Sequence, residues 1–313
     1  MKIFHSTQDF KSDKKTIVTI GTFDGVHIGH NKIIDKIVQN CKSGNTESLI
    51  LTFFPHPRMV LNENSDIKLL NTINEKSGLL SENGIQNLVI QNFNTAFSEL
   101  SAEEFVANVL VKQLNIQKII IGHDHHFGKN RSANIHDLIV FGKKFGFEVE
   151  QISVEEIDDV AISSTKIRNA IIEGNITLAN EYLGYNYQIS GKIVKGKQLG
   201  RTIGFPTANI HLEENYKLIP KFGVYIVKSF FENKTIFGIM NIGLKPTFDD
   251  KNVTIEVHFL DFNADLYNKK ITVSILEFIR NEQKFDGIDD LKSQIEKDKI
   301  FALNFLAKKE FKN

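Results

Sequence analysis

The stretch that decides the fold of the first half is Thr16–His30, TIVTIGTFDGVHIGH. Its β-branched start, Thr16–Ile20, predicts a buried strand, which Gly21 ends. The chain then passes through Phe23-Asp24-Gly25 and enters a helical pattern just after His27-Ile28-Gly29-His30. The stretch therefore predicts a strand, a phosphate-binding turn and a helix.

The residues of this turn suit an anion. Gly21, Gly25 and Gly29 let the backbone bend tightly and approach a ligand, while the following helix turns its free N–H groups toward the turn. His27 and His30 are three residues apart, so both imidazoles can face one side and donate hydrogen bonds to phosphate oxygens. A glycine-rich strand-to-helix turn is ordinary in α/β proteins, but two histidines around a glycine favour a functional site.

These residues carry a first resemblance. Phe23, Asp24, Gly25, His27, Gly29 and His30 resemble the HxGH signature of the nucleotidyltransferase superfamily, whose members move a nucleoside monophosphate from a triphosphate onto an acceptor. The resemblance implies that His27 and His30 are catalytic. It also implies that the nucleotide is bound by the residues around them, namely Gly21, Phe23, Asp24, Gly25 and Gly29.

Strand and helix patterns alternate after this turn. Helices are expected over residues 31–41, 74–83, 101–114 and 136–145, and strands over 48–54, 87–90, 118–121 and 148–154. Alternation predicts a parallel sheet covered on both faces, with ligands at the carboxyl ends of its strands. One such end carries His56 and Arg58, which could contact phosphate or merely cap the loop.

Another strand end carries a polar loop with His123, Asp124, His125 and His126. A loop could fold these side chains around zinc, but no cysteine or second histidine pair stands at a familiar spacing. The loop resembles the second substrate loop of bacterial flavin adenylyltransferases, which implies that Asp124 binds substrate. This chain departs from that family at His125, His126 and Ala133.

The segment Ile162–Arg168, ISSTKIR, opens a further helix. Ser163 or Ser164 can cap that helix and leave N–H groups free for an anion, and Arg168 lies one turn in. An ordinary capped helix with a solvated arginine is the alternative. The segment is similar to the ISSTxIR motif of the same family, which implies that Ser163, Ser164 and Thr165 bind phosphate and that Arg168 assists catalysis.

The pattern changes after Leu183-Gly184. Short β-type segments follow, expected at 188–194, 223–230, 234–240, 254–259 and 270–278, and they predict an antiparallel barrel. A closing helix is expected over residues 288–306. It should pack on the barrel through one apolar stripe, made of Ile288, Leu291, Ile295, Ala302 and Phe305.

A glycine-rich segment, Gly196–Asn209, carries the chemistry of this half. Its spacing matches neither a Walker loop nor a protein-kinase loop, so the residues alone predict only a phosphate loop. GRxxGFPTAN resembles the riboflavin kinase signature, which implies Mg2+ at Thr207 and Asn209. The nucleotide phosphates would then be wrapped by the rest of the segment, namely Gly196, Lys197, Gly200, Arg201, Gly204 and Pro206.

Glu256 lies on the strand expected at 254–259, on the face opposite Ile255 and Val257. A solvated carboxylate on the outer face is one interpretation. The stretch EVHFLDF resembles the riboflavin kinase pattern that contains the general base, and this implies that Glu256 is that base. Asn241 and Arg280 match segments that contact the flavin in that family.

Length and composition predict a soluble, two-domain protein. The chain has 313 residues, 41% of them hydrophobic and 24% charged, and no apolar run long enough for a bilayer, so no membrane partner is expected. Basic and acidic residues balance at 38 each, which gives no indication of nucleic-acid binding. A single cysteine, Cys41, and the absence of a signal-peptide pattern in residues 1–15 predict a cytoplasmic protein.

The resemblance extends over nearly the whole chain, to bacterial bifunctional riboflavin kinases and FAD synthetases. It implies a Rossmann-like FMN adenylyltransferase domain over residues 1–184 and a riboflavin kinase β-barrel over residues 185–313. Riboflavin, FMN and ATP would be the substrates, with Mg2+, in a monomer or weak homo-oligomer. Two alternatives stay open: a single-activity enzyme whose other half is regulatory, and a non-catalytic flavin-binding protein.

Overall fold

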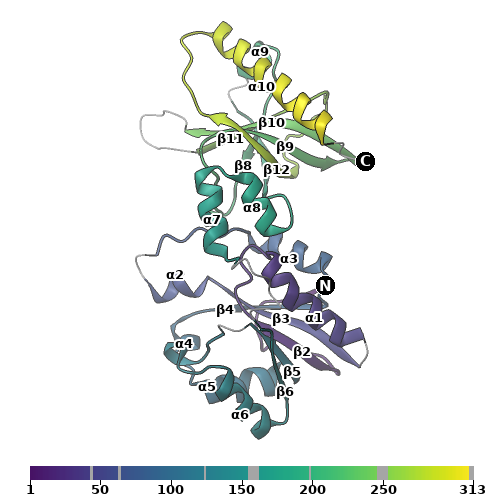
Figure 1. Cartoon of the computed structure of the whole chain (residues 1–313), viewed down its shortest axis with the longest axis vertical. Coiled ribbons are helices and arrows are strands. Elements are labelled where there is room, and N and C mark those ends of the chain that lie inside the picture. Colours follow the sequence, from purple (N-terminus) through teal and green to yellow (C-terminus); the bar gives the residue numbers. More distant parts are fainter. Residues whose placement is uncertain are drawn as a thin grey trace. The chain divides into compact units, whose positions relative to one another are not determined.

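The computed structural model describes residues 1–42, 45–62, 65–122, 125–153, 162–196, 199–244 and 253–309. The chain divides into two compact units, Met1–Ser164 and Thr165–Asn313, and each has its own sheet (Figure 1). Within the described residues, no helix combines the length and the apolar character needed to cross a membrane.

The first unit is built on a six-stranded parallel sheet in the order β1-β4-β3-β2-β5-β6. Its strands are β1 (Lys2–Phe4), β2 (Lys15–Ile20), β3 (Thr46–Phe54), β4 (Asn87–Asn92), β5 (Ile116–Ile121) and β6 (Glu148–Gln151). The strand order reverses between β2 and β5, so a crevice is expected beyond the carboxyl ends of these two strands. The turn after β2 therefore stands where ligands bind in such sheets.

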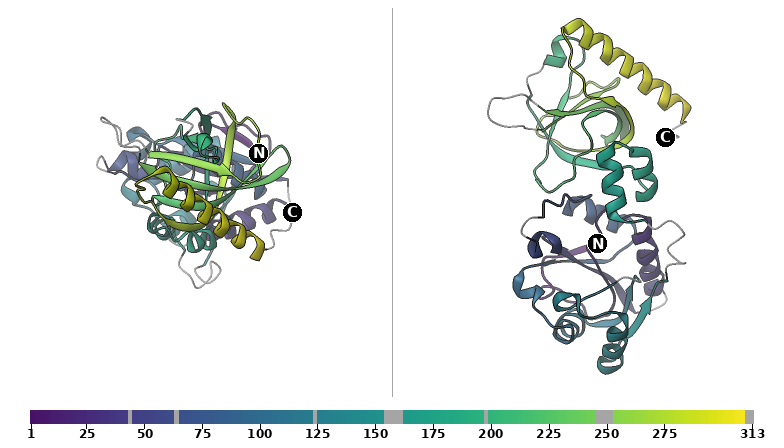
Figure 2. Two further views of the ribbon diagram at one scale, coloured as in Figure 1. Left: turned by 90° about the horizontal axis from the view of Figure 1, so that it is seen from above. Right: turned by 60° about the vertical axis from the view of Figure 1, so that its left-hand side comes forward.

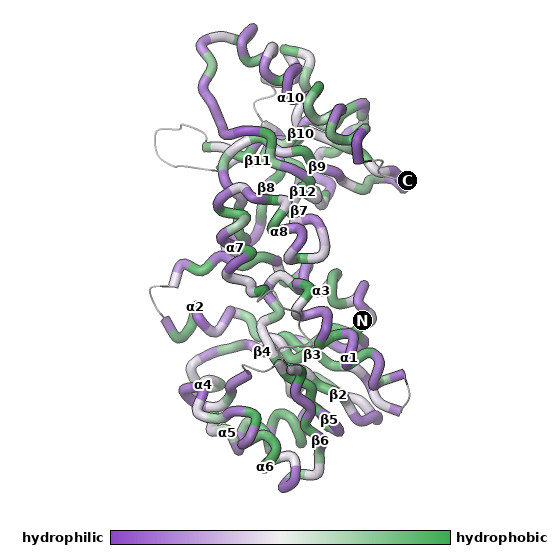
Figure 3. Tube along the Cα trace, viewed as in Figure 1, coloured by the Kyte–Doolittle hydropathy of each residue, from purple (hydrophilic) through white to green (hydrophobic). Residues whose placement is uncertain are grey.

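Helices connect the strands of this sheet. They are α1 (Ile28–Lys42), α2 (Pro57–Leu61), α3 (Ile73–Glu82), α4 (Thr95–Ser98), α5 (Ala102–Glu104), η1 (Phe105–Gln113), η2 (Lys129–Arg131) and α6 (Ile135–Phe145). The strands supply most of the core, with fully buried residues such as Val18, Leu49 and Ile119. Figure 3 shows the hydrophobic stretches along β2 and β3.

The expected elements of this unit are present, with three differences. The helix expected over 101–114 has its predicted capping box, Ser101 with Glu104, but continues as a π-helix over Phe105–Gln113. The strand β6 is described to Gln151, and residues 154–161 lie outside the described part. Helix α1 begins at Ile28, so His30 lies inside its first turn rather than before it.

The second unit contains a closed antiparallel barrel in the order β10-β11-β8-β7-β12-β9, which the right-hand view of Figure 2 shows. Its strands are β7 (Gln188–Val194), β8 (Ala208–His211), β9 (Gly223–Phe231), β10 (Lys234–Leu244), β11 (Val253–Phe259) and β12 (Lys270–Asn281). The remaining helices are α7 (Ser164–Glu173), α8 (Ile176–Leu183), α9 (Leu199–Thr202) and α10 (Ile288–Lys308). The predicted barrel is confirmed.

Two helices pack on this barrel. Asn180 of α8 donates through Nδ2 to the carbonyl of Ile275, 2.9 Å away, and so ties α8 to β12. Helix α10 covers the outer face through Ala302, which is fully buried in a cluster with Val224 and Ile226. The prediction that Ile288 belongs to the buried stripe of α10 is wrong, because this residue is 66% exposed.

Candidate active sites

The turn after β2 is built from left-handed residues. Gly25 has φ 92°, which suits glycine, and its neighbours Phe23 and Val26 also adopt positive φ, at 46° and 39°. Such conformations are costly for residues with a Cβ and cluster at ligand sites. The His27 carbonyl then accepts hydrogen bonds from the N–H groups of His30 and Asn31, at 2.8 and 3.0 Å, and starts α1.

The two histidines of the turn stack on each other. Their ring centroids lie 3.7 Å apart with the planes 17° from parallel, and the Phe23 ring lies 4.8 Å from that of His30. Among the described residues, the Nδ1 atoms of His27 and His30 are buried and have no hydrogen-bond partner. Buried polar atoms in native proteins are normally paired, so these two nitrogens indicate a place for a ligand.

Both histidines are uncharged at neutral pH. Burial lowers the pKa of His27 to about 4, although the nearby Asp24 acts in the opposite direction. Burial also holds the pKa of His30 well below its usual value, and the charges of His27 and Lys76 lower it further. A neutral imidazole carries one N–H, so each ring can donate one hydrogen bond to an anion without adding a charge.

Asp24 and Ser164 connect this turn to two other segments. The Asp24 carboxylate is buried and accepts hydrogen bonds from the N–H groups of Leu70 and Asn71, at 2.9 and 3.4 Å. The Ser164 hydroxyl donates to the Asp24 carbonyl at 2.8 Å. The start of the ISSTKIR segment therefore contacts the HxGH turn directly. Asp24 supports the backbone, and the Ser164 hydroxyl donates to the turn.

The other residues predicted for this site belong to the start of α7 and to the segment that follows β5. Ser163 is half-buried just before α7, Thr165 is exposed, and Arg168 is half-buried one turn after Ser164. Asp124 and His123 lie outside the described residues. The zinc interpretation, which needs both side chains, is therefore not tested by the structure. Of the same loop, Phe127 and Ala133 pair as a short antiparallel bridge.

Two other polar side chains of the first unit have structural roles. The Nδ1 atom of His56 accepts from the N–H of Arg58 at 3.1 Å and caps α2, which favours the capping interpretation for that loop. Cys41 is half-buried, and burial raises the pKa of its thiol. A thiol with a raised pKa is a poor nucleophile, in line with the packing role expected for it.

Sequence reasoning missed Lys76 and Thr52. Lys76 on α3 is 3% exposed, and its Nζ donates to the Thr22 carbonyl at 2.7 Å, at the start of the turn. The hydroxyl of Thr52, at the end of β3, donates to the same carbonyl at 3.1 Å. A lysine on the inward face of the helix expected at 74–83 was the available signal, since lysine is seldom fully buried.

In the second unit, the barrel register aligns three predicted residues in one row. Glu256 of β11 pairs with Asn209 of β8 on one side and with Asn241 of β10 on the other. Directly paired residues of antiparallel strands share a face of the sheet. Because Ile255 and Val257 are buried on the opposite face, this row lies on the outer face of the barrel.

The glycine-rich segment covers part of this row. Thr207 Oγ1 donates to Glu256 Oε2 at 3.1 Å, and the Pro206 carbonyl lies 2.9 Å from Nδ1 of His258. Glu256 is therefore half-buried under the segment and not a solvated outer-face carboxylate. This hydrogen bond brings together Thr207 and Glu256, which belong to two motifs that are far apart in the sequence.

The glycines of the segment permit this close approach. A Cβ on Gly196 would lie 2.4 Å from Nδ2 of Asn209, and one on Gly200 would lie 2.2 Å from the Phe205 carbonyl oxygen. Gly204 has φ 89°, in the left-handed region. These positions require glycine to bring the backbone against the strands. Lys197 lies outside the described residues.

A hollow of about 440 Å³ adjoins Thr207 and Arg201. Residues of the connection between β11 and β12 line it together with apolar residues of the barrel strands. The residues that line it are Ile193, Arg201, Pro206, Thr207, Ala208, Val257, Phe259, Phe262, Asn263, Ala264, Asp265, Leu266 and Tyr267. The hollow has the mixed apolar and polar lining that suits a small organic ligand.

Arg280 is held by α10. Its Nε and Nη2 atoms donate to both carboxylate oxygens of Asp298, at 2.8 to 3.1 Å, and Asp298 is buried. Arg280 and Asn241 are both in register with Val224 of β9. The guanidinium thus attaches α10 to the barrel beside the row of Asn209, Glu256 and Asn241.

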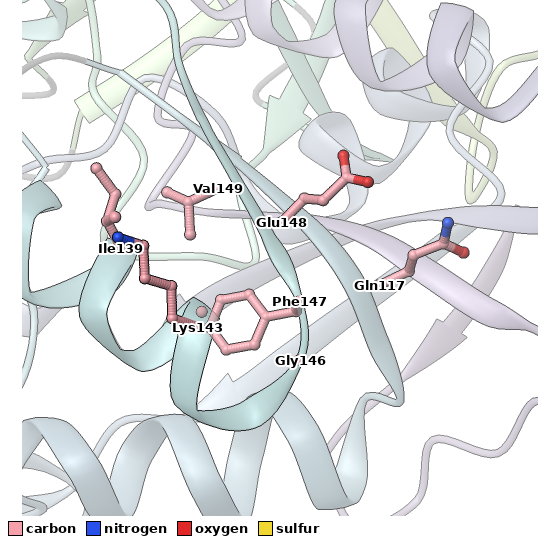
Figure 4. Close-up of a pocket in the computed structure, with 8 residues that line it drawn as sticks. Gln117, Ile139, Lys143, Gly146, Phe147, Glu148 and Val149 are labelled. Carbon is pink, nitrogen blue, oxygen red and sulfur yellow. The ribbon is translucent and has the colours of Figure 1, made fainter.

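A second hollow lies in the first unit, between α6 and β6, with a volume of about 530 Å³ (Figure 4). It is lined by Gln117 and Glu148, at the starts of β5 and β6, and by Phe147 and Lys143. Ligands of parallel sheets bind at the opposite, carboxyl ends of the strands. No residue of the predicted sites lines this hollow.

Each half of the chain matches a known protein family. Residues 9–166 match the FAD synthetase family, and residues 183–306 match the riboflavin kinase family. The chain is 40% identical over 303 residues to a bifunctional riboflavin kinase/FMN adenylyltransferase of Buchnera aphidicola, covering 95% of this chain and 96% of that protein. The protein of the same description from Listeria monocytogenes is 39% identical, with coverages of 97% and 96%.

A solved structure shares the fold. The crystal structure described as a macrolide-efflux protein from Streptococcus pneumoniae matches with a TM-score of 0.87 at 30% identity. The match covers 97% of this chain and 98% of that chain. Thus one fold extends over nearly the full length of both proteins.

Proposed function

The chain belongs to the family of bifunctional riboflavin kinases/FMN adenylyltransferases, and from that membership we propose how its residues divide the two reactions. Residues 1–184 form the FMN adenylyltransferase domain and residues 185–313 the riboflavin kinase domain. The enzyme phosphorylates riboflavin to FMN with ATP, and then transfers AMP from a second ATP to FMN, which yields FAD and pyrophosphate.

The kinase reaction takes place on the outer face of the barrel. The terminal ribityl hydroxyl of riboflavin attacks the γ-phosphate of ATP, and Glu256 accepts the proton of that hydroxyl. The hydrogen bond of 3.1 Å from Thr207 to Glu256 is the observation that carries this assignment, since it brings the two motif residues together. Because Thr207 contacts Oε2, the other oxygen, Oε1, is the one assigned to the substrate proton.

The donor set here fits Mg2+. Thr207, Asn209 and Glu256 offer hydroxyl, amide and carboxylate oxygens in one place, and magnesium prefers hard oxygen ligands while keeping several waters and phosphate oxygens. Thr207 and Asn209 are the residues proposed to hold it. Magnesium, when bound, would balance negative charge on the phosphates of ATP.

The hollow beside Thr207 is proposed as the nucleotide site of the kinase. Arg201 and Thr207 both line it, and an arginine there can pair with phosphate oxygens. The apolar lining, with Val257 and Phe259 from the face of β11 opposite Glu256, suits a flat base. Thr207 lines the hollow and also donates to Glu256, so it connects the hollow to the outer-face row. The glycines of the segment, Gly196, Gly200 and Gly204, have no side chain that would block the approach of the phosphates.

Asn241, in the same row as Glu256, is proposed to contact the flavin. Arg280 is proposed to act on the flavin site by holding α10 through Asp298.

The adenylyl transfer needs no general base, because the phosphate of FMN is already ionised at neutral pH. One of its oxygens attacks the α-phosphate of ATP, a P–O bond forms, and the bond to the β-phosphate breaks with release of pyrophosphate. His27 and His30 donate neutral hydrogen bonds to the charge that builds up on the phosphoryl group. Ser163, Ser164, Thr165 and Arg168 hold the departing pyrophosphate.

The setting of the enzyme is also proposed. Cys41 is a free thiol and needs no oxidising compartment, which supports a cytoplasmic location. The partners are small molecules, namely riboflavin, FMN and ATP, without nucleic acid or membrane. The chain acts as a monomer or weak homo-oligomer.

The decisive test is incubation of the full chain with riboflavin, excess ATP and Mg2+, followed by chromatographic separation of the flavins over time. We expect FMN to appear first and FAD later. FMN without FAD, also when FMN is supplied directly, would restrict the function to the kinase. Flavin binding without conversion would instead support a storage protein.

A further inference from the structure

A buried lysine lies beneath the phosphate turn of the first unit and has no part in the mechanism described above. Lys76 of α3 is 3% exposed, and its ammonium donates to the Thr22 carbonyl at 2.7 Å. Burying a charge is costly unless the charge is paired or has a task. An ammonium group has three donors, of which the Thr22 carbonyl takes one.

The hydrogen bond to the Thr22 carbonyl does not by itself require a charged donor. The Thr22 carbonyl already accepts a hydrogen bond from the neutral hydroxyl of Thr52, at 3.1 Å. The nearby carboxylate of Asp24 accepts from the N–H groups of Leu70 and Asn71. Neutral donors thus also hold the backbone of the turn, while the charge of Lys76 balances that of the buried Asp24 carboxylate.

The charged groups that act on the histidine pair are Asp24 and Lys76. Burial lowers the pKa of Lys76 to about 8, with Asp24 acting against this, so the ammonium is still about 90% protonated at pH 7. His27 and His30 are neutral at the same pH, and Lys76 is among the causes of the low pKa of His30. Lys76 therefore supplies the positive charge that the two imidazoles lack.

We propose that Lys76 is a positioning residue of the adenylyl-transfer site: its ammonium orients the Thr22 carbonyl at the start of the turn and places a positive charge near the buried histidine pair. The same charge favours the approach of the triphosphate and the flavin phosphate. This inference rests on the proposed FMN adenylyltransferase function of the first unit.

The test compares Lys76→Met, Lys76→Arg and Thr52→Val in the full chain. Methionine keeps the length of the side chain but removes the charge and the hydrogen bond. Thr52→Val removes the other hydrogen bond to Thr22 while the charge remains. The readouts are kcat and KM for FMN adenylylation, the riboflavin kinase rate as an internal control of folding, and the pKa of His30 from NMR titration of its imidazole.

For Lys76→Met we expect kcat for FMN adenylylation to fall roughly 10- to 100-fold, with the kinase rate unchanged. The pKa of His30 should rise by about half a pH unit or more, because a neighbouring cation has been removed. Thr52→Val should leave the pKa of His30 unchanged, and Lys76→Arg should recover part of the rate lost in Lys76→Met.

The proposal is overturned if Lys76→Met leaves both kcat and the pKa of His30 unchanged, or if Thr52→Val reproduces both effects. A loss of thermal stability with an unchanged pKa of His30 would also overturn it, since that result shows a packing role. Absence of FAD formation in the unmodified protein would reject the proposed function, and the titration of His30 would still decide the role of Lys76.

Discussion

The two candidate sites are proposed to bind the same kind of substrate, a nucleoside triphosphate, but they are built in different ways. At the turn after β2, the reactive side chains are buried, stacked and neutral, and they come from one contiguous stretch around His27 and His30. On the barrel, the reactive carboxylate of Glu256 is half-buried and lies under a loop from another part of the chain. In the first site, burial keeps the histidines uncharged. In the second, strand register places Glu256 next to Asn209 and Asn241.

The difference follows from the nucleophile that each site is proposed to serve. An FMN phosphate is already ionised, so its site needs hydrogen-bond donors and no proton acceptor. A ribityl hydroxyl must lose a proton, so its site needs an accessible carboxylate. Four changes would break or sharpen this comparison.

The largest effect is expected from Glu256→Gln. The amide keeps the shape of the side chain and its contact with Thr207 but cannot accept the proton, so kcat of the riboflavin kinase should fall roughly 10³-fold. FMN adenylylation should be unchanged. Separate assays with riboflavin and with FMN as substrate measure the two rates. Glu232→Gln, at an exposed turn of the same unit, is the matched control, and a kinase rate retained in Glu256→Gln would remove Glu256 from the mechanism.

His30→Ala should do the reverse. Loss of one neutral donor to the phosphoryl group should lower kcat of FMN adenylylation about 10²-fold and leave the kinase rate intact. Product analysis should then show FMN accumulation from riboflavin. His5→Ala, an exposed histidine of the same unit, serves as the control. Undiminished FAD synthesis in His30→Ala would contradict the assignment of the turn.

The stability of the first unit should depend on pH through its buried histidines. The pKa of His27 in the folded protein, about 4, lies below its unfolded value of 6.5, so its contribution is complete above pH 6.5 and is lost as the pH falls toward 4. Between pH 7 and pH 5 the loss should be about 2 kcal/mol in the free energy of unfolding.

Denaturant titrations at both pH values, with His27→Phe as comparison, measure this loss. The variant has no group to protonate at that position and should lose less stability. Equal losses in the two proteins would mean that burial of His27 does not control the pH dependence.

The smallest effect is expected from Gly196→Ala. The added Cβ would lie 2.4 Å from the Asn209 amide nitrogen, so the amide must move. We expect KM for ATP in the kinase reaction to rise about 5- to 10-fold, because Asn209, the proposed Mg2+ ligand, loses its position. Gly287→Ala, where a Cβ meets nothing within 4 Å, is the matched control. An unchanged KM in Gly196→Ala would argue against a role of Asn209 as ligand.

Most of the fold could be predicted from periodicity, and the failures have identifiable causes. Strand β8 (Ala208–His211) was missed because four residues after a glycine-rich loop give too little alternation to detect. Ile288 was placed on the buried stripe of α10, but it is the first residue of the helix and is 66% exposed. The π geometry of Phe105–Gln113 has no signal in the pattern of apolar residues.

The candidate sites divide in the same way. That His27 and His30 lie on the same side of the turn followed from their spacing of three residues, although the stacking of their rings was not predicted. The position of Glu256 on the face opposite Ile255 and Val257 followed from strand alternation. Contacts between distant elements could not be predicted in this way. The hydrogen bond of Ser164 to the Asp24 carbonyl and that of Lys76 to the Thr22 carbonyl depend on tertiary packing alone.

The row of Asn209, Glu256 and Asn241 restricts how this barrel can evolve. Each strand alternates its side chains between two faces, so one inserted or deleted residue within β11 would turn Glu256 into the barrel interior and point Ile255 or Val257 outward. Only a bulge, like the register shifts of β12 at Ile275/Glu277 and Phe278/Arg280, could absorb such a change. Length variation among descendants should therefore accumulate in the connections between strands, while the strands themselves keep their length.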